Sequence, residues 1–171
     1  MRSYPENLFF ALRPADGAAE ALASVRDWLA PPGATRIGTG HLRLTLLLLE
    51  PQPSTRTRIE CTKQVLGEAM LPACRVMFDR LIGGRRSGLV LPSEPLLGVE
   101  RLYAQLVSKV RCCGISAPKR WQFHPHVTLY YGKRSFSGPI DPIGWRAEEL
   151  VLIRSHVGRT RHETIGRWSL Q

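Results

Sequence analysis

Residues 123–129 read Phe-His-Pro-His-Val-Thr-Leu, and residues 41–46 read His-Leu-Arg-Leu-Thr-Leu. Both segments carry the pattern His-x-(Arg or His)-x-Thr-Leu, and each follows a stretch with helical periodicity. Side chains of a β-strand alternate between its two faces, so each segment forms one polar face and one apolar face. The repeated pattern predicts two related halves that place equivalent strands side by side.

The polar faces of these two strands form the candidate site. His126 and Thr128 share a face of one strand, and Arg43 and Thr45 share a face of the other. Polar side chains in phase on an otherwise apolar strand are costly to bury unless that face lines a cleft. Two hydroxyls, a guanidinium and an imidazole that converge would bind a phosphate, and an imidazole also exchanges protons near neutral pH.

The remaining hydrophobic patterns predict an α+β order of elements in one domain, residues 1–171, which the repeated motif divides into two pseudo-symmetric lobes. Strands are expected over residues 7–12, 42–49, 127–131, 149–157 and 163–170. Helices are expected over residues 16–29, with Asp16 as the N-cap, and over residues 54–70 and 93–113. Residues 75–82 and 88–91 flank Gly83-Gly84-Arg85-Arg86-Ser87, which predicts a β-hairpin with a basic tip.

The composition favours a globular domain with an anionic partner. Lys and Arg number 24 against 14 Asp and Glu, a net charge of +10, which suits a nucleic acid or a nucleotide. A solvated, arginine-rich surface is the alternative explanation, so charge alone does not decide function. The longest apolar run, residues 46–49, is far shorter than the ~20 residues of a membrane-spanning helix. The first residues do not resemble a signal peptide, and we expect a cytoplasmic monomer without membrane contact.

The four cysteines are expected to be small buried apolar residues. Cys61, Cys74, Cys112 and Cys113 lack the paired spacing of a zinc site. Neither a metal nor a cofactor is expected.

Residues 123–129 resemble the second signature of the two-histidine (2H) phosphoesterase superfamily, in the branch of RNA 2′,3′-cyclic phosphodiesterases, also called 2′-5′ RNA ligases. Residues 8–14 and 166–170 are similar as well, so the resemblance covers nearly the whole chain. It implies a bilobal α+β fold, with two antiparallel sheets around a central groove and helices outside. It also implies metal-independent hydrolysis of RNA with a 2′,3′-cyclic phosphate end, or of a cyclic nucleotide. Two histidines would exchange protons as base and acid, while two Thr or Ser hydroxyls bind phosphate oxygens.

The first signature departs from this family, because Arg43 stands where the first catalytic histidine belongs. Arginine stays protonated and stabilises charge without exchanging protons. His41 is four residues from Thr45, about 13 Å along an extended strand, so it replaces the missing histidine only through a bend or bulge. Two functions therefore remain open. One is a weakly active cyclic phosphodiesterase with His126, Thr128, Thr45 and Arg43 as catalytic residues. The other is a non-catalytic protein that binds RNA or nucleotide phosphate.

Further side chains are expected around the phosphate site as substrate contacts: His124, Lys119, Arg120, Tyr130 and His162. His124 shares a face with His126 and is expected to orient or flank it. Aromatic side chains such as Tyr130, Tyr131 or Trp121 would stack on a base, and the basic loops would attract RNA phosphates.

Overall fold

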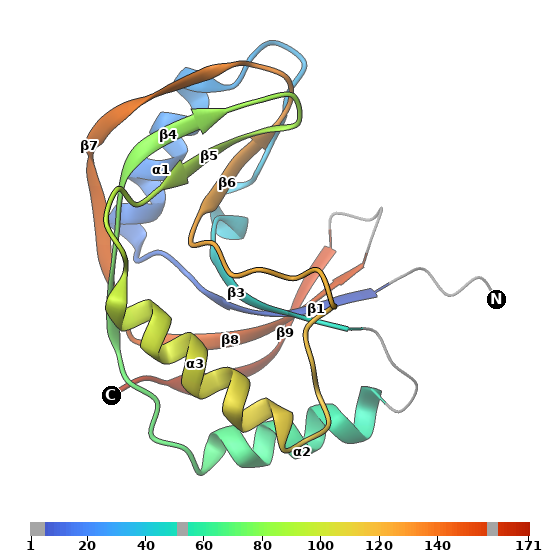
Figure 1. Cartoon of the computed structure of the whole chain (residues 1–171). Coiled ribbons are helices and arrows are strands. Elements are labelled where there is room, and N and C mark those ends of the chain that lie inside the picture. Colours follow the sequence, from blue (N-terminus) through green and yellow to red (C-terminus); the bar gives the residue numbers. More distant parts are fainter. Residues whose placement is uncertain (1–5, 51–54, 157–160) are drawn as a thin grey trace, which may run out of the picture.

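The computed structural model describes residues 6–50, 55–156 and 161–171. The described residues form two antiparallel sheets, which face each other in Figure 1. The four-stranded sheet has the order β3 (Leu44–Leu49), β1 (Glu6–Leu12), β8 (Glu149–His156) and β9 (Arg161–Ser169). The five-stranded sheet has the order β2 (Thr35–Arg36), β6 (Val127–Tyr131), β5 (Ser87–Leu91), β4 (Cys74–Gly83) and β7 (Phe136–Ala147). The expected α+β fold with two antiparallel sheets is confirmed.

Three α-helices in the described part of the chain cover the outer sides of this arrangement (Figure 1). Helix α1 (Asp16–Leu29) packs on β6 and β7, while α2 (Thr55–Gly67) and α3 (Leu97–Arg111) pack on each other below the four-stranded sheet. None of the helices in the described ranges is long and apolar enough to cross a membrane. Each helix turns its apolar stripe toward a sheet, which leaves the facing sides of the two sheets open for a site.

The helix ends differ from the sequence predictions for local reasons. Ala15 is the N-cap of α1 and Asp16 is its first residue, so the expected Asp16 cap is wrong. Helix α3 begins at Leu97 instead of residue 93, because Ser93 donates from its backbone N and its hydroxyl to the Asp79 carboxylate at 2.8 and 2.5 Å. Pro95 also disfavours helical backbone at the residue before it. Ser54 and Val157, expected at element ends, lie outside the described residues.

Strand β7 is the main element absent from the sequence prediction. It contains two prolines and two glycines, which argue against a strand in sequence. It lies at the edge of the five-stranded sheet. A proline has no N–H group, and on an edge strand this group can face away from the sheet, so no hydrogen bond to a neighbouring strand is lost. The pairing of β4 with β7 is therefore decided by the tertiary fold.

The two motif strands, β3 and β6, belong to different sheets, so the prediction that they lie side by side is wrong. They carry the same irregularity at the same motif position. In β3, Ala11 pairs with Thr45 and Phe10 pairs with Leu47, so Leu46 is an extra residue. In β6, Leu89 pairs with Thr128 and Gly88 pairs with Tyr130, so Leu129 is the extra residue. A bulge of this kind shifts the alternation of side chains by one position. The third residue after each motif threonine, Leu48 or Tyr131, therefore returns to the threonine's face, while the two between are buried.

Gly88 makes room for this bulge. Tyr130 is fully buried, and a Cβ added to Gly88 would lie 2.4 Å from its ring. Any side chain at this position would displace the tyrosine and, with it, the strand that carries Thr128.

We expect Gly88→Ala to lower the free energy of unfolding by about 1–3 kcal/mol, because the extra methyl group overpacks the core. Gly84→Ala in the same hairpin is the matched control, because nothing lies within 4 Å of a Cβ added there. Urea unfolding measures both variants, and equal stability of the two would contradict this packing of Tyr130.

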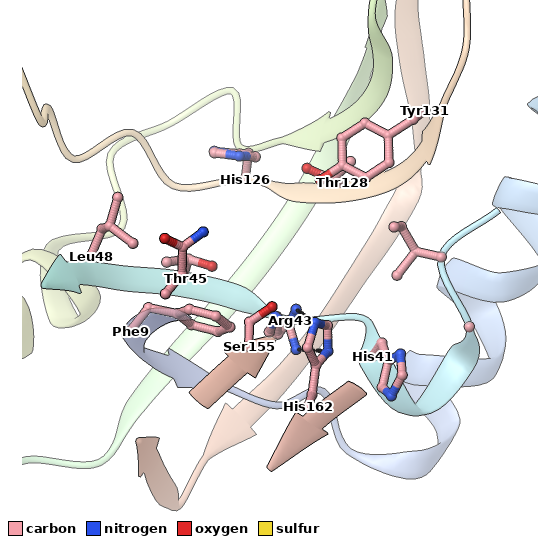
Figure 2. A pocket seen from close by; sticks show the side chains of 13 residues that line it. Phe9, His41, Arg43, Thr45, Leu48, His126, Thr128, Tyr131, Ser155 and His162 are labelled. Carbon is pink, nitrogen blue, oxygen red and sulfur yellow. Dashed lines mark hydrogen bonds between the residues drawn. The ribbon is translucent and has the colours of Figure 1, made fainter. Parts of the chain in front are cut away.

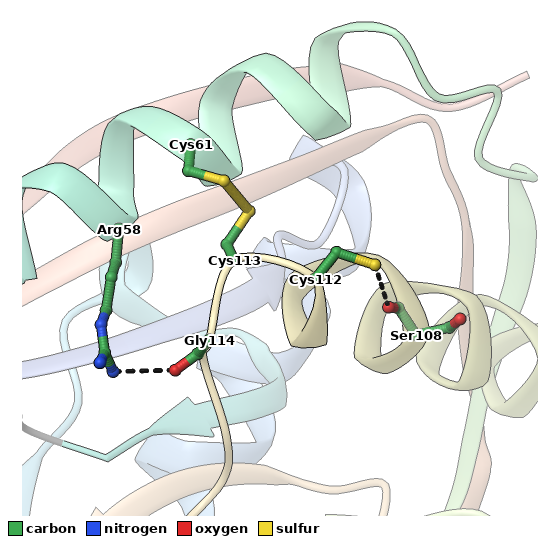
Figure 3. The surroundings of a disulfide bond; sticks show 6 residues. All are labelled: Arg58, Cys61, Ser108, Cys112, Cys113 and Gly114. Carbon is green, nitrogen blue, oxygen red and sulfur yellow. Dashed lines mark hydrogen bonds between the residues drawn. A yellow bond between two sulfur atoms is a disulfide. The ribbon is translucent and has the colours of Figure 1, made fainter.

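The cysteines differ from the expectation of four buried apolar side chains. Cys61 on α2 and Cys113 just after α3 form a disulfide bond with a Cα–Cα distance of 5.8 Å (Figure 3). Cys112 is exposed and its thiol donates to the Ser108 carbonyl, while Cys74 is buried. Spacing along the chain gave no sign of the disulfide, because its partners are 52 residues apart.

We expect Cys61→Ala to lower stability by about 2–4 kcal/mol under oxidising conditions, because the disulfide restricts the unfolded chain. Cys112→Ala is the control and should unfold like the parent protein. Thermal unfolding with and without dithiothreitol measures the effect: reductant should destabilise the parent and the control but leave Cys61→Ala unchanged.

Candidate functional site

A cavity of about 330 Å³ lies between the two sheets. It is lined by the motif strands β3 and β6, by β1, β8 and β9, and by the segment that precedes β3. Its residues are Asn7, Phe9, Ile37, Gly38, His41, Arg43, Thr45, Leu48, His126, Thr128, Tyr131, Ser155 and His162. The structure thus brings Arg43, Thr45, His126 and Thr128 to one cavity, with the β6 side chains on one side and those of β3 opposite (Figure 2).

His126 is held in one tautomer by a hydrogen bond to the backbone two residues earlier. Its Nδ1 atom lies 2.7 Å from the carbonyl oxygen of His124. A carbonyl oxygen only accepts hydrogen bonds, so Nδ1 must carry a proton. In the neutral imidazole the lone pair is then on Nε2, which leaves this nitrogen able to take a proton from a bound molecule.

Arg43 is fixed on two sides. Its guanidinium carbon lies 4.6 Å from the centre of the Phe9 ring, and its Nη1 atom lies 3.1 Å from His162 Nδ1. Burial and the nearby Arg13 charge lower the pKa of Arg43 to about 10, although Tyr131 opposes this shift. Arg43 therefore stays charged at neutral pH and adds a fixed positive charge to the cavity.

His162 is held neutral beside this charge. Burial, the Arg43 charge and His41 lower the pKa of His162 to about 4. Because a guanidinium only donates, His162 must accept at Nδ1, which requires the neutral ring. His162 also packs against His41, with 4.6 Å between the ring centres. His162 therefore orients Arg43 and adds no second positive charge to the cavity.

His41 reaches the cavity through a bend. A short 3₁₀ turn, Thr39–His41, precedes β3, so the chain is not extended between His41 and Arg43. Such a bend is the condition under which His41 was expected to approach the site, and His41 lines the cavity together with Arg43 and Thr45.

Of the other expected substrate contacts, only His162 lines the cavity. Lys119 and Arg120 lie in an exposed turn outside the cavity lining. The His124 side chain is exposed and bonds Gln122 at 3.3 Å, so only its carbonyl reaches His126. Tyr130 as a base-stacking residue is wrong, because the bulge in β6 turns it into the core.

Tyr131, one of the aromatic residues expected to stack on a base, is brought to the cavity by the bulge and is 56% exposed. Other cavity residues, such as Asn7 and Ser155, were not found from sequence. Asn7 and Ser155 pair across β1 and β8, and Ser155 also pairs with His162. A small apolar cluster beside them, Phe9, Ala11, Val151 and Ile153 with Leu48 packed on it, forms the floor between the sheets. Asn7 and Ser155 stand at the ends of otherwise apolar runs in β1 and β8, and nothing in the sequence shows that these strands are neighbours.

The structure is similar over its whole length to solved proteins of one architecture. E. coli LigT in complex with 3′-AMP matches with a TM-score of 0.79 and 23% identity, over 98% of this chain and 99% of that one. A protein described as a phosphoesterase matches with a TM-score of 0.76 and 23% identity over the same shares. The protein TT0787 of Thermus thermophilus matches with a TM-score of 0.71 and 21% identity, over 96% of this chain and 97% of that one. The chain has the 2H phosphoesterase fold.

No protein-family model and no curated protein matches the chain. The 2H phosphoesterase fold is therefore recognised through its architecture, which the resemblance of residues 123–129 implied. At these identities the comparison establishes the fold, and the chemistry depends on the cavity residues of this chain.

We expect Arg43→Gln to raise the pKa of His162 from about 4, because the variant removes the neighbouring charge, while burial, the largest cause, and His41 still keep this pKa below its ordinary value. Imidazole NMR signals followed against pH measure the shift, and Arg101→Gln on α3 is the control. The parent protein should also lose stability as the pH falls from about 6.5 to about 4, because the unfolded chain protonates this histidine first. An unchanged His162 pKa in Arg43→Gln would contradict the contact.

Proposed function

We propose that this protein binds the phosphate of a nucleotide or RNA 2′,3′-cyclic phosphate in the cavity and hydrolyses it slowly. The observation that carries the proposal is the placement of Arg43, Thr45, His126 and Thr128 around one cavity. Two hydroxyls and a fixed guanidinium match the oxygens of a phosphodiester. LigT with 3′-AMP, with phosphate, with ATP and with NADP⁺ supports a phosphate-bearing ligand for this fold.

His126 is the proton-transfer residue in this proposal. Its Nε2 takes a proton from water as the water oxygen bonds to phosphorus, and the bond from phosphorus to one ribose oxygen breaks. That oxygen takes a proton from solvent, and the product is a phosphomonoester. Thr45 and Thr128 donate to the non-bridging oxygens, and Arg43 stabilises their charge.

Arg43 limits the rate. With a pKa of about 10, it keeps its proton at neutral pH and leaves the departing oxygen without a general acid. A general acid contributes about 10²–10⁴ in rate. Turnover should therefore be slow, while binding of the phosphate is strong.

A binding protein without turnover is the second candidate, and the same residue favours it. In that case Arg43 and the two threonines hold a phosphate, and His126 transfers no proton.

We expect His126→Ala to lower kcat for 2′,3′-cyclic AMP by about 10²–10⁴, because the proton acceptor is removed. His124→Ala is the matched control on the same chain segment, because its exposed side chain lies outside the cavity and its carbonyl remains. Product release is followed by chromatography or ³¹P NMR. Turnover that survives His126→Ala would refute the proposed site.

Arg43→His distinguishes the two candidates. It supplies a second imidazole and should raise kcat about tenfold or more if a general acid is missing. Turnover that appears only in this variant would make the natural chain a binding protein. A loss of turnover in His41→Ala equal to that in His126→Ala would make His41 the second proton-transfer residue.

A further inference from the structure

A second concave site lies beside the cavity, at the tip of the β4–β5 hairpin. It has a volume of about 370 Å³ and is lined by Ile82, Gly83, Gly84, Arg85, Arg86, Ser87 and Leu89. The two arginines are exposed, and in the part of the chain that the structure describes neither forms an ion pair. Two adjacent cations without acidic partners attract an anion to this tip.

The strand register connects this tip site to the cavity. Thr128 on β6 pairs with Leu89 on β5, and Leu89 pairs with Ile82 on β4. Directly paired residues point to the same face of a sheet, so Leu89 and Ile82 continue the surface that carries Thr128. Neighbouring strands are about 4.8 Å apart, which places Ile82 roughly 10 Å from Thr128.

Tyr131 lies between the two sites. It lines the cavity, and its backbone pairs with Ser87, which lines the tip site. Tyr131 is 56% exposed, and Ile82 in the lining of the tip site is 42% exposed. An exposed aromatic ring next to a phosphate site is suited to stack a base, and exposed aliphatic carbon is suited to cover a ribose or base face.

The backbone of the tip is fixed by hydrogen bonds. The N–H groups of Gly84, Gly132 and Arg134 donate to the carbonyls of Ser87, Arg86 and Gly84, at 3.1, 2.9 and 3.1 Å respectively. Arg85 and Arg86 therefore extend from a backbone that is tied to the connection between β6 and β7. A rigid support lowers the cost of ordering a ligand on these side chains.

We propose that the tip site binds an internucleotide phosphate of single-stranded RNA whose 3′ end lies in the cavity. The terminal phosphate contacts Arg43, Thr45 and Thr128, the terminal base stacks on Tyr131, and the strand crosses Leu89 and Ile82 in the 5′ direction. The tip site rests on the proposed phosphate binding in the cavity and deepens it, because it makes an oligonucleotide, rather than a free mononucleotide, the preferred ligand.

Binding is tested with two probes that cannot be hydrolysed at the cavity: a fluorescent tetraribonucleotide with a 3′-phosphate, and 3′-AMP. The parent protein should bind the tetranucleotide at least tenfold more tightly than 3′-AMP. Arg85→Gln with Arg86→Gln should remove this advantage and leave the affinity for 3′-AMP within twofold. The slope of log Kd against log salt should fall by about 0.7 for each RNA phosphate that the variant no longer neutralises.

The control is Arg101→Gln with Arg111→Gln, which removes the same charge from the exposed side of α3. It should leave both affinities unchanged. An equal decrease of tetranucleotide binding in both double variants would show a general charge effect and overturn the tip site. Equal binding of the two probes by the parent protein, or weaker 3′-AMP binding in the tip variant, would overturn it as well.

The experiments distinguish a failure of the tip-site proposal from a failure of the hydrolysis proposal. If the parent protein does not hydrolyse 2′,3′-cyclic AMP but the tip variant still loses tetranucleotide affinity, the hydrolysis proposal is wrong and the tip site stands. If 2′,3′-cyclic AMP is hydrolysed and the tip variant binds the tetranucleotide like the parent, the hydrolysis stands and the tip site is wrong.

Discussion

The site depends on the phase of side chains along two strands that face each other. Strands β3 and β6 each present a threonine to the space between the sheets, and in each strand the leucine after that threonine is an extra residue in the pairing. The bulge buries two successive side chains and returns the third to the open face. Without it, Leu47 and Tyr130 would enter the cavity in place of Leu48 and Tyr131. A one-residue change in pairing thus decides what the cavity contains.

The second constraint is electrostatic. Arg43 is buried enough for its pKa to fall to about 10, yet it stays charged, and a buried charge needs partners. The Phe9 ring and the neutral His162 supply them from β1 and β9, so two elements distant in sequence orient one guanidinium. A histidine at position 43 would exchange protons in this place. The arginine instead provides a permanent positive charge without a mobile proton.

These two features are the basis of the proposed phosphate ligand and of the proposed slow turnover. The β6 side offers a histidine whose tautomer is set by the carbonyl of His124, so one proton acceptor is prepared. The β3 side offers positive charge that anchors an anion but cannot protonate a leaving group. The basic hairpin tip extends the same surface of the five-stranded sheet, because Leu89 and Ile82 follow Thr128 across neighbouring strands.

The sequence alone determined the α+β class, most strands and helices, and the alternation of side chains in two repeated motifs, but not that the two motif strands belong to different sheets. Local periodicity and the fixed alternation of a strand carry that information. It failed where distant segments decide the outcome: the proline-containing β7 is stable only as an edge strand, and Cys61 meets Cys113 only because α2 packs on α3.

The residues that line the cavity show the same difference between what the local sequence determines and what distant segments decide. Tyr131 replaces Tyr130 because of a bulge against Gly88, and His162 reaches Arg43 because β9 lies beside β8. The local sequence decides which side chains a strand carries and how they alternate. Which strands become neighbours, and in which register, is decided by packing over the whole chain, because only the assembled sheets bury the apolar faces that fix that register.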